Sequence, residues 1–132
     1  MYAELHCLSH FSFLRGASAP AELVSRAAAC RYHALAITDE CSLAGVVKAH
    51  VAAKEHHLKL IIGSEFTLTE GIRLVALAPN REAYGELSGL ISRARRRCHK
   101  GEYTVHLRDI IFHLKRCLII LLPDDTHHQT VY

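Results

Sequence analysis

Short apolar runs alternate with amphipathic stretches along most of the chain. The apolar runs predict five strands, over residues 2–8, 34–38, 58–68, 72–78 and 118–122. Between them, apolar residues recur at helical spacing and predict helices over residues 18–30, 43–57, 80–98 and 107–115. Apolar strands that are separated by amphipathic helices indicate an α/β fold with a mainly parallel sheet and outer helices.

Two of the predicted helices carry a stripe of side chains at helical spacing. In the second helix the stripe consists of Val46, Val47, His50, Val51 and Lys54. In the third helix it is longer and more apolar, and consists of Tyr84, Leu87, Leu90, Ile91, Ala94 and Cys98. We expect such stripes to face the sheet, because an amphipathic helix buries its apolar side.

The last predicted strand, residues 118–122, is very apolar. In an open five-stranded sheet it would form an unpaired edge, which natural proteins avoid. An incomplete barrel, whose remaining strands follow residue 132, accounts better for this strand. We therefore expect one domain over residues 1–123 and a frayed tail over residues 124–132, where no periodicity is visible.

Composition narrows the class of protein. The chain has 132 residues, half of them apolar, which is enough for one ordinary domain. A formal net charge of +3 permits contact with nucleic acid without arguing for it. The five cysteines are scattered and form no CxxC pair, as expected for reduced thiols. No signal peptide or membrane-length apolar run is visible, so we expect a cytoplasmic protein without membrane contact.

The second predicted strand ends in Thr38, Asp39 and Glu40. Charged side chains at the C-terminal ends of strands are where α/β sheets and barrels place their chemistry. These carboxylates are therefore the first candidates for a functional site.

Three longer segments, taken together, resemble a known domain: "YAELHCLSHFSFLRGAS", "ALAITDECSLAGVVKAHVAAKEHHLKLIIGSE" and "RLVALAPNREAYGELSGLISRARRRCHKGEY". They are similar to the N-terminal PHP (polymerase and histidinol phosphatase) domain of bacterial C-family DNA polymerases, and above all of their error-prone members. The resemblance implies the first part of a distorted (β/α)7 barrel. It also implies a larger polymerase core as partner, which copies damaged templates, holds its own magnesium and makes the contact with DNA.

In active PHP domains, histidines and carboxylates at the ends of the strands hold divalent metals, and a metal-bound water attacks a phosphate ester. The resemblance assigns four residues of this chain to that site: His6, Asp39, Glu40 and Glu65. Glu40 stands where the family has a histidine.

Three further ligand positions are occupied by residues that cannot bind a metal. Leu8 replaces the second histidine of a His-x-His pair, and Arg15 and Arg73 stand at two more ligand positions. Arginine is always protonated and repels a cation, whereas clustered carboxylates need a positive partner. We hypothesise that guanidinium groups have replaced the metals, which predicts Arg73 or Arg15 within hydrogen-bonding distance of Glu40 or Glu65. On this view the chain has no catalytic residue and no cofactor.

Two alternatives to a structural domain stay open. The chain could be a stand-alone metal-dependent phosphoesterase of the PHP family. At the site itself, His6, Glu40 and Glu65 could still bind one weak metal ion whose shell is completed by water. The chain could also be a non-functional, truncated remnant that has no stable fold.

Two further predictions concern arginine residues. Arg93, Arg96 and Arg97 lie on the polar side of the third helix, and form either a solvated surface or a contact with nucleic acid or the polymerase core. Arg31 stands where the resembling family commonly has glycine, which suggests a position with positive φ and a cost of about 1 kcal/mol.

Overall fold

The computed structural model describes residues 2–9, 11, 16 and 18–123, and its elements follow the predicted order. The strands are β1 (Ala3–Cys7), β2 (Ala34–Ile37), β3 (Lys59–Thr67), β4 (Arg73–Ala78) and β5 (Leu118–Leu121). The helices are α1 (Pro20–Ala29), α2 (Val46–Glu55), α3 (Arg81–Arg96) and α4 (Leu107–His113). None of the described helices has the length and apolar character needed to cross a bilayer.

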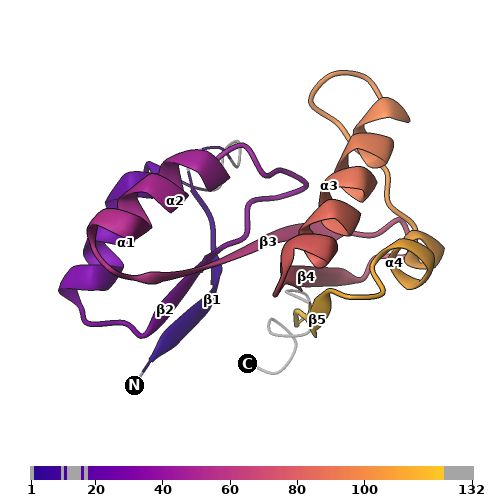
Figure 1. The fold of residues 1–132 in the computed structure, drawn as a ribbon. Helices are drawn as coiled ribbons and strands as arrows, with labels where there is room; N and C mark the ends of the chain where they lie inside the picture. Colours follow the sequence, from indigo (N-terminus) through magenta and orange to yellow (C-terminus); the bar gives the residue numbers. More distant parts are fainter. Residues whose placement is uncertain (1, 10, 12–15, 17, 124–132) are drawn as a thin grey trace, which may run out of the picture.

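The strands form one curled sheet in the order β1-β2-β3-β4-β5, which is the shape of part of a barrel (Figure 1). The expected α/β fold class is confirmed. The expected share of parallel pairing was too high, because only β1–β2 and β2–β3 are parallel, while β3–β4 and β4–β5 are antiparallel. β3 and β4 pair antiparallel because only residues 68–72 connect them, and so short a connection can form a hairpin but not a crossover to a parallel strand.

Two groups of helices pack on the sheet through separate clusters of apolar side chains (Figure 1). The cluster under α1 and α2 contains Val24, Ala27, Leu35, Ile37 and Ala49. The cluster under α3 and α4 contains Phe66, Leu74, Leu87, Leu90 and Ile110. The long strand β3 runs beneath both groups and joins them.

The side of α2 that packs is not the stripe that the sequence suggested. The buried residues of α2 are Ala49, Ala52 and Ala53, whereas Val47 is 73% exposed and Val51 is 53% exposed. Small alanine side chains let α2 approach α1 and the sheet closely, and this close packing outweighs the burial of two valines. The stripe of α3 is confirmed, since Leu87, Leu90 and Ala94 are buried.

The ends of α1 and α2 have the same backbone geometry. Arg31 has φ +60° and His57 has φ +54°, each at the first position after a helix cap. After α1, the Arg31 N–H donates to the Ala28 carbonyl and the Tyr32 N–H to the Ala27 carbonyl, both at 3.0 Å. These bonds form a Schellman motif, in which the left-handed position favours glycine. The expectation of positive φ at Arg31 is confirmed.

Candidate functional site

The candidate site lies where the C-terminal ends of β1 and β2 meet the second half of β3. His6 stands near the end of β1, Glu40 follows β2, and Glu65 lies within β3. Glu40 and Glu65 form a parallel bridge, in which the Cys41 N–H donates to the Glu65 carbonyl at 2.8 Å. The fold therefore brings together residues that are far apart in the chain, as the resemblance implied.

Glu65 is fully buried, with a relative exposure of 0%. Its Oε1 atom lies 2.7 Å from His6 Nε2 and 3.5 Å from Arg73 Nη2. Arg73 is the first residue of β4 and pairs with Thr67 of β3, two residues beyond Glu65. Its guanidinium therefore reaches the Glu65 carboxylate diagonally across the β3–β4 hairpin. This is the kind of contact that the guanidinium hypothesis requires.

The Asp39 carboxylate binds the loop that follows β1. Its Oδ1 atom accepts from the Ser9 N–H and its Oδ2 atom from the Ser9 hydroxyl, both at 2.6 Å. The Ser64 hydroxyl donates to the Asp39 carbonyl at 2.7 Å. Since Asp39 and Ser9 are both buried, these bonds fasten the loop after β1 to the end of β2. Ser9 was not singled out from the sequence.

Glu40 is held by an aromatic residue from a distant loop. The Tyr103 hydroxyl donates to Glu40 Oε2 at 2.5 Å and accepts from the Thr67 N–H at 2.9 Å. Burial, together with the bond to the Glu40 carboxylate, raises the pKa of Tyr103 well above its ordinary value. Tyr103 is therefore a neutral donor at any physiological pH, and the sequence alone did not identify it.

Arg95 of α3 supports this arrangement from above the Tyr103 ring. Its guanidinium carbon lies 5.3 Å from the ring centroid, and it donates to the carbonyls of Cys41 at 3.0 Å and Glu102 at 3.2 Å. Cys41 has φ +44°, so Arg95 fixes the carbonyl of a residue in an unusual backbone conformation. Burial raises the pKa of the Cys41 thiol to about 12, which makes it unreactive at neutral pH.

Comparisons with known proteins agree with this geometry. The family model described as "PHP domain" matches residues 4–126. The chain belongs to the PHP domain family. It is 61% identical over 127 residues to an error-prone DNA polymerase of Saccharophagus degradans, which covers 96% of this chain and 12% of that protein. It is 60% identical over 122 residues to the error-prone DNA polymerase of Teredinibacter turnerae, covering 92% and 12%. The resemblance drawn from the sequence is thus confirmed, and this PHP domain spans about 12% of the length of the curated relatives it matches.

Two solved structures share the fold. One is a candidate metal-dependent phosphoesterase from Bifidobacterium adolescentis, with 29% identity and a TM-score of 0.59. The other is an amidohydrolase from Chromobacterium violaceum with bound sulfate and no metal, with 28% identity and a TM-score of 0.59. Each alignment covers 73% of this PHP domain and 34% of the neighbour.

The three positions where the sequence predicts that metal ligands have been replaced lie in different parts of the chain. Leu8 is half-buried and lines a hollow between β1 and α1 together with Leu23 and Tyr32. Arg73 faces Glu65, as described above, and Arg15 lies outside the described residues. Within the described part of the chain, no three His, Cys, Asp or Glu side chains are grouped so that they could hold a metal ion.

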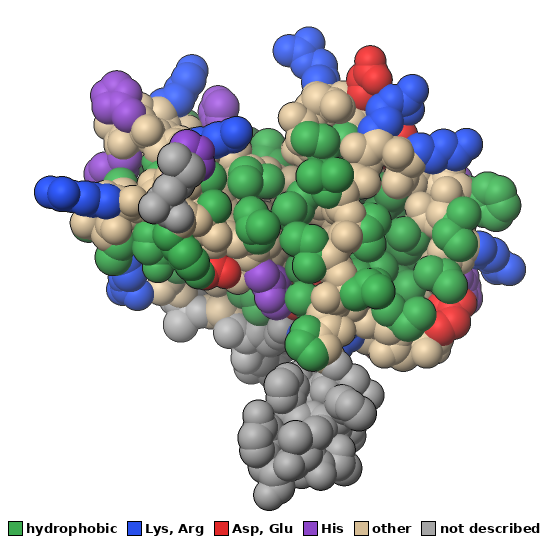
Figure 2. Space-filling view, turned by 90° about the horizontal axis from the view of Figure 1, so that it is seen from below, with side chains coloured by type: hydrophobic (Ala, Val, Ile, Leu, Met, Phe, Trp, Pro, Cys, Tyr) green, Lys and Arg blue, Asp and Glu red, His purple; other side chains and the backbone are tan. Residues whose placement is uncertain are grey.

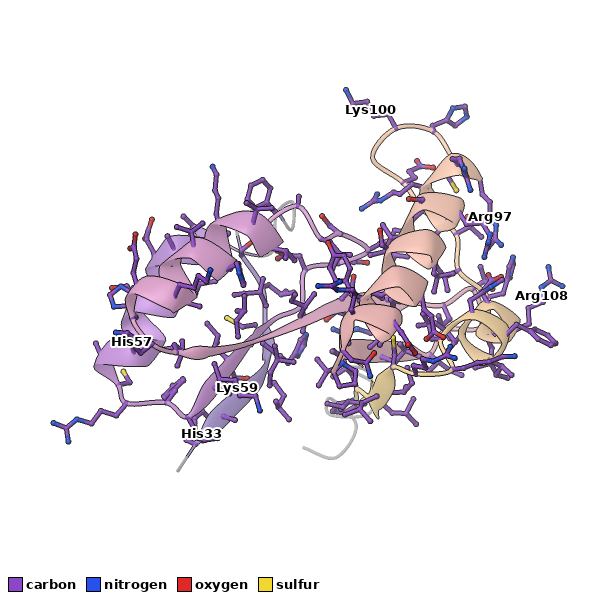
Figure 3. All side chains as sticks on the ribbon, viewed as in Figure 1. His33, His57, Lys59, Arg97, Lys100 and Arg108 are labelled. Atoms are coloured by element: carbon purple, nitrogen blue, oxygen red, sulfur yellow. The ribbon has the colours of Figure 1, made fainter. Side chains whose placement is uncertain are left out.

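Two arginines of the basic run take part in packing between α3 and α4. Arg97 forms a bidentate pair with buried Asp109, at 2.6 and 3.0 Å, beside the end of α3 (Figure 3). Arg93 donates to the His113 ring at 3.0 Å. The hydrogen bonds from Arg97 hold the pKa of Asp109 well below its ordinary value. Contact of Arg93, Arg96 and Arg97 with nucleic acid or a polymerase core stays a prediction.

Proposed function

We propose that this PHP domain has lost its metal-dependent chemistry and acts as a structural module of an error-prone DNA polymerase. The observation that carries the proposal is the surrounding of Glu65, a fully buried carboxylate with Arg73 and His6 beside it. A guanidinium at this distance supplies the positive charge that a metal would otherwise supply, and it repels a cation that approaches the same oxygen.

The other acidic residues support the same proposal. Asp39 uses both carboxylate oxygens to bind Ser9, and Glu40 is bonded to Tyr103. The resemblance implies that active family members need these side chains to face two or three shared metal ions, which activate a water molecule. In this chain each carboxylate instead joins two segments of the fold. We therefore assign no catalytic residue and no cofactor to the domain.

The proposed partner is the remainder of the polymerase. The exposed surface of α4 and β5 supports this, because it carries large apolar side chains: Ile111 is 62% exposed, Phe112 67%, Leu118 59% and Leu121 70%. Figure 2 shows hydrophobic side chains gathered on this part of the molecule. Contiguous exposed apolar surface marks a protein interface. DNA synthesis on damaged templates, its magnesium ions and the DNA contact then belong to the partner, in the cytoplasm.

Metal analysis of the purified chain tests the loss of the metal site. After dialysis against Mn²⁺ or Zn²⁺, we expect much less than one ion per chain by mass spectrometry, and no heat of binding by calorimetry. The control variant L8H/E40H/R73H restores three of the family's ligand positions and removes the Glu40 carboxylate that is bonded to Tyr103. A gain of metal binding by this variant shows that the assay detects such a site. One tightly bound ion per wild-type chain, together with hydrolysis of a phosphate ester, would favour the phosphoesterase alternative.

A chimera tests the structural role. In the Saccharophagus degradans polymerase, the residues that match this chain are replaced by it. We expect primer extension at a rate close to that of the parent enzyme, whereas deletion of the same residues should give an unstable enzyme. A chimera that is as unstable as the deletion would contradict the proposal. Absence of a cooperative thermal transition in the isolated chain would instead support the remnant alternative.

A further inference from the structure

A groove runs along α2, between that helix, the helix-covered side of β3 and the start of α3. It consists of two adjoining hollows of about 380 and 340 Å³ that share Leu60. The first hollow is lined by apolar side chains, among them Val46, Ile62, Pro79 and Tyr84. The second continues toward the end of α2, where Figure 3 labels His57. We call this surface the α2–α3 groove.

The order of the elements explains why the groove is open. α1 connects β1 to β2, and α2 connects β2 to β3, so each of these parallel strands is followed by a helix that covers the sheet. β3 is followed instead by the hairpin at residues 68–72, so no crossover helix lies between α2 and α3. Figure 1 shows the two groups of helices standing apart above β3.

The surface of α2 beside the groove is apolar as well. Val47 is 73% exposed and Val51 is 53% exposed. A rotation of about 100° per residue places these valines next to Val46, His50 and Lys54, on the side away from the buried alanines. They therefore extend the apolar lining of the groove outward, to a surface that a second helix could contact along its length.

The charges of the groove have one sign. The charged residues that line it are Lys54 and Arg81, both positive, and no carboxylate lines either hollow. We propose that the α2–α3 groove binds an amphipathic helix of a partner protein. The apolar side of that helix would contact Leu60, Ile62 and the exposed valines, and acidic side chains along its flank would face Lys54 and Arg81. Helix-in-groove binding by apolar anchors and charge complementarity is a common mode of recognition.

Peptide binding to the full 132-residue chain tests the proposal. The probe is a fluorescent synthetic helix of about four turns, with leucines at i, i+3, i+4 and i+7 and glutamates on the flanks. Two control peptides have the same leucines with lysine flanks, or the same composition in scrambled order. In fluorescence anisotropy at about 0.15 M salt, we expect saturable binding of the acidic helix and at least tenfold weaker binding of both controls.

Charge reversal locates the binding site. K54E and R81E should each weaken binding of the acidic helix about tenfold, and V51S should weaken it as well. The matched control is R96E, which makes the same charge change about 20 Å further along α3; it should leave the affinity within twofold. Circular dichroism of each variant checks that the fold is intact.

Several outcomes would overturn the proposal. They are equal binding of the scrambled peptide, no binding of the acidic helix at about 1 mM, or equal losses in R96E and K54E. Self-association of the chain that K54E abolishes, seen by analytical ultracentrifugation, would also overturn it, because the groove would then bind a second copy of the chain. None of these outcomes concerns metal binding, so this test and the test of the proposed function fail independently.

Discussion

The distance between Arg73 and Glu65 allows the free energy of coupling between these two side chains to be predicted. Their nearest atoms are 3.5 Å apart, and the Glu65 side chain is 0% exposed while that of Arg73 is 25% exposed. At an effective dielectric constant of about 20, Coulomb's law gives an attraction of about 5 kcal/mol at this distance. Partial exposure of the guanidinium and the long contact reduce this value, so we expect a coupling energy of about 2 kcal/mol.

A double-mutant cycle measures this coupling. R73M leaves Glu65 with less positive charge around it and should lower the free energy of unfolding by about 2 to 3 kcal/mol. E65Q removes the charge that needs compensation and should cost about 1 kcal/mol. The double variant R73M/E65Q should then be no less stable than R73M, since the uncompensated charge is gone. The matched control R96M removes an exposed arginine and should change stability by less than about 0.5 kcal/mol.

Urea unfolding at neutral pH, followed by circular dichroism under reducing conditions, is the appropriate assay, because the chain has no tryptophan and five cysteines. The reasoning is refuted if R73M is as stable as R96M. It is also refuted if the losses in R73M and E65Q simply add in the double variant, because additive losses mean no coupling between the two side chains.

Three further predictions concern other parts of the fold. R31G should raise the melting temperature by about 2 to 4 °C because it relieves a left-handed conformation, while R31A should not. Y103F removes a donor from Glu40 and an acceptor from the Thr67 N–H, and should cost about 1 to 3 kcal/mol in urea unfolding. Asp109 has a lowered pKa in the folded state, so its pairing stabilises the protein fully above about pH 4, and this contribution is lost as the pH falls further. D109N should therefore cost about 2 to 3 kcal/mol at neutral pH and flatten the acid limb of a stability–pH curve.

The order of helices and strands could be predicted because its signals are local. Strand runs such as residues 34–37 and the stripe of α3 repeat with periods that survive in any tertiary context. The packed side of α2 could not be predicted in the same way. Val47 and Val51 have the higher hydrophobicity, but Ala49, Ala52 and Ala53 allow the closer approach, and that choice depends on the facing helix.

The acidic and histidine residues of the candidate site could be predicted from the sequence, but their hydrogen-bond partners could not. His6, Asp39, Glu40 and Glu65 lie at or near strand ends, where the resemblance to the PHP family assigns ligands. Their actual partners come from segments far along the chain: Tyr103 is 63 residues from Glu40, and Ser9 is 30 residues from Asp39.

Among the site residues that the sequence analysis did not identify, Arg95 has the most distinctive position in the sequence. It lies four residues after Ile91 and three before Cys98, beside the buried stripe of α3, and not on the polar side with Arg93 and Arg96. An arginine at such a position has to direct its guanidinium toward acceptors near the core. Its contacts with the Cys41 carbonyl and the Tyr103 ring are the result.

Replacement of a metal by a guanidinium preserves the charge balance of a buried carboxylate but removes the Lewis acid that activates water. A fold can therefore survive this exchange while its chemistry does not. If this exchange took place in the chain, as we propose, it extends beyond Arg73, because the Glu40 carboxylate is bonded to Tyr103 and both oxygens of Asp39 are bonded to Ser9. Restoring a histidine at position 73 alone would return one ligand and leave these bonds in place. We therefore infer that recovery of a metal site requires release of Glu40 as well as new ligands, which makes the loss of chemistry difficult to reverse by single substitutions.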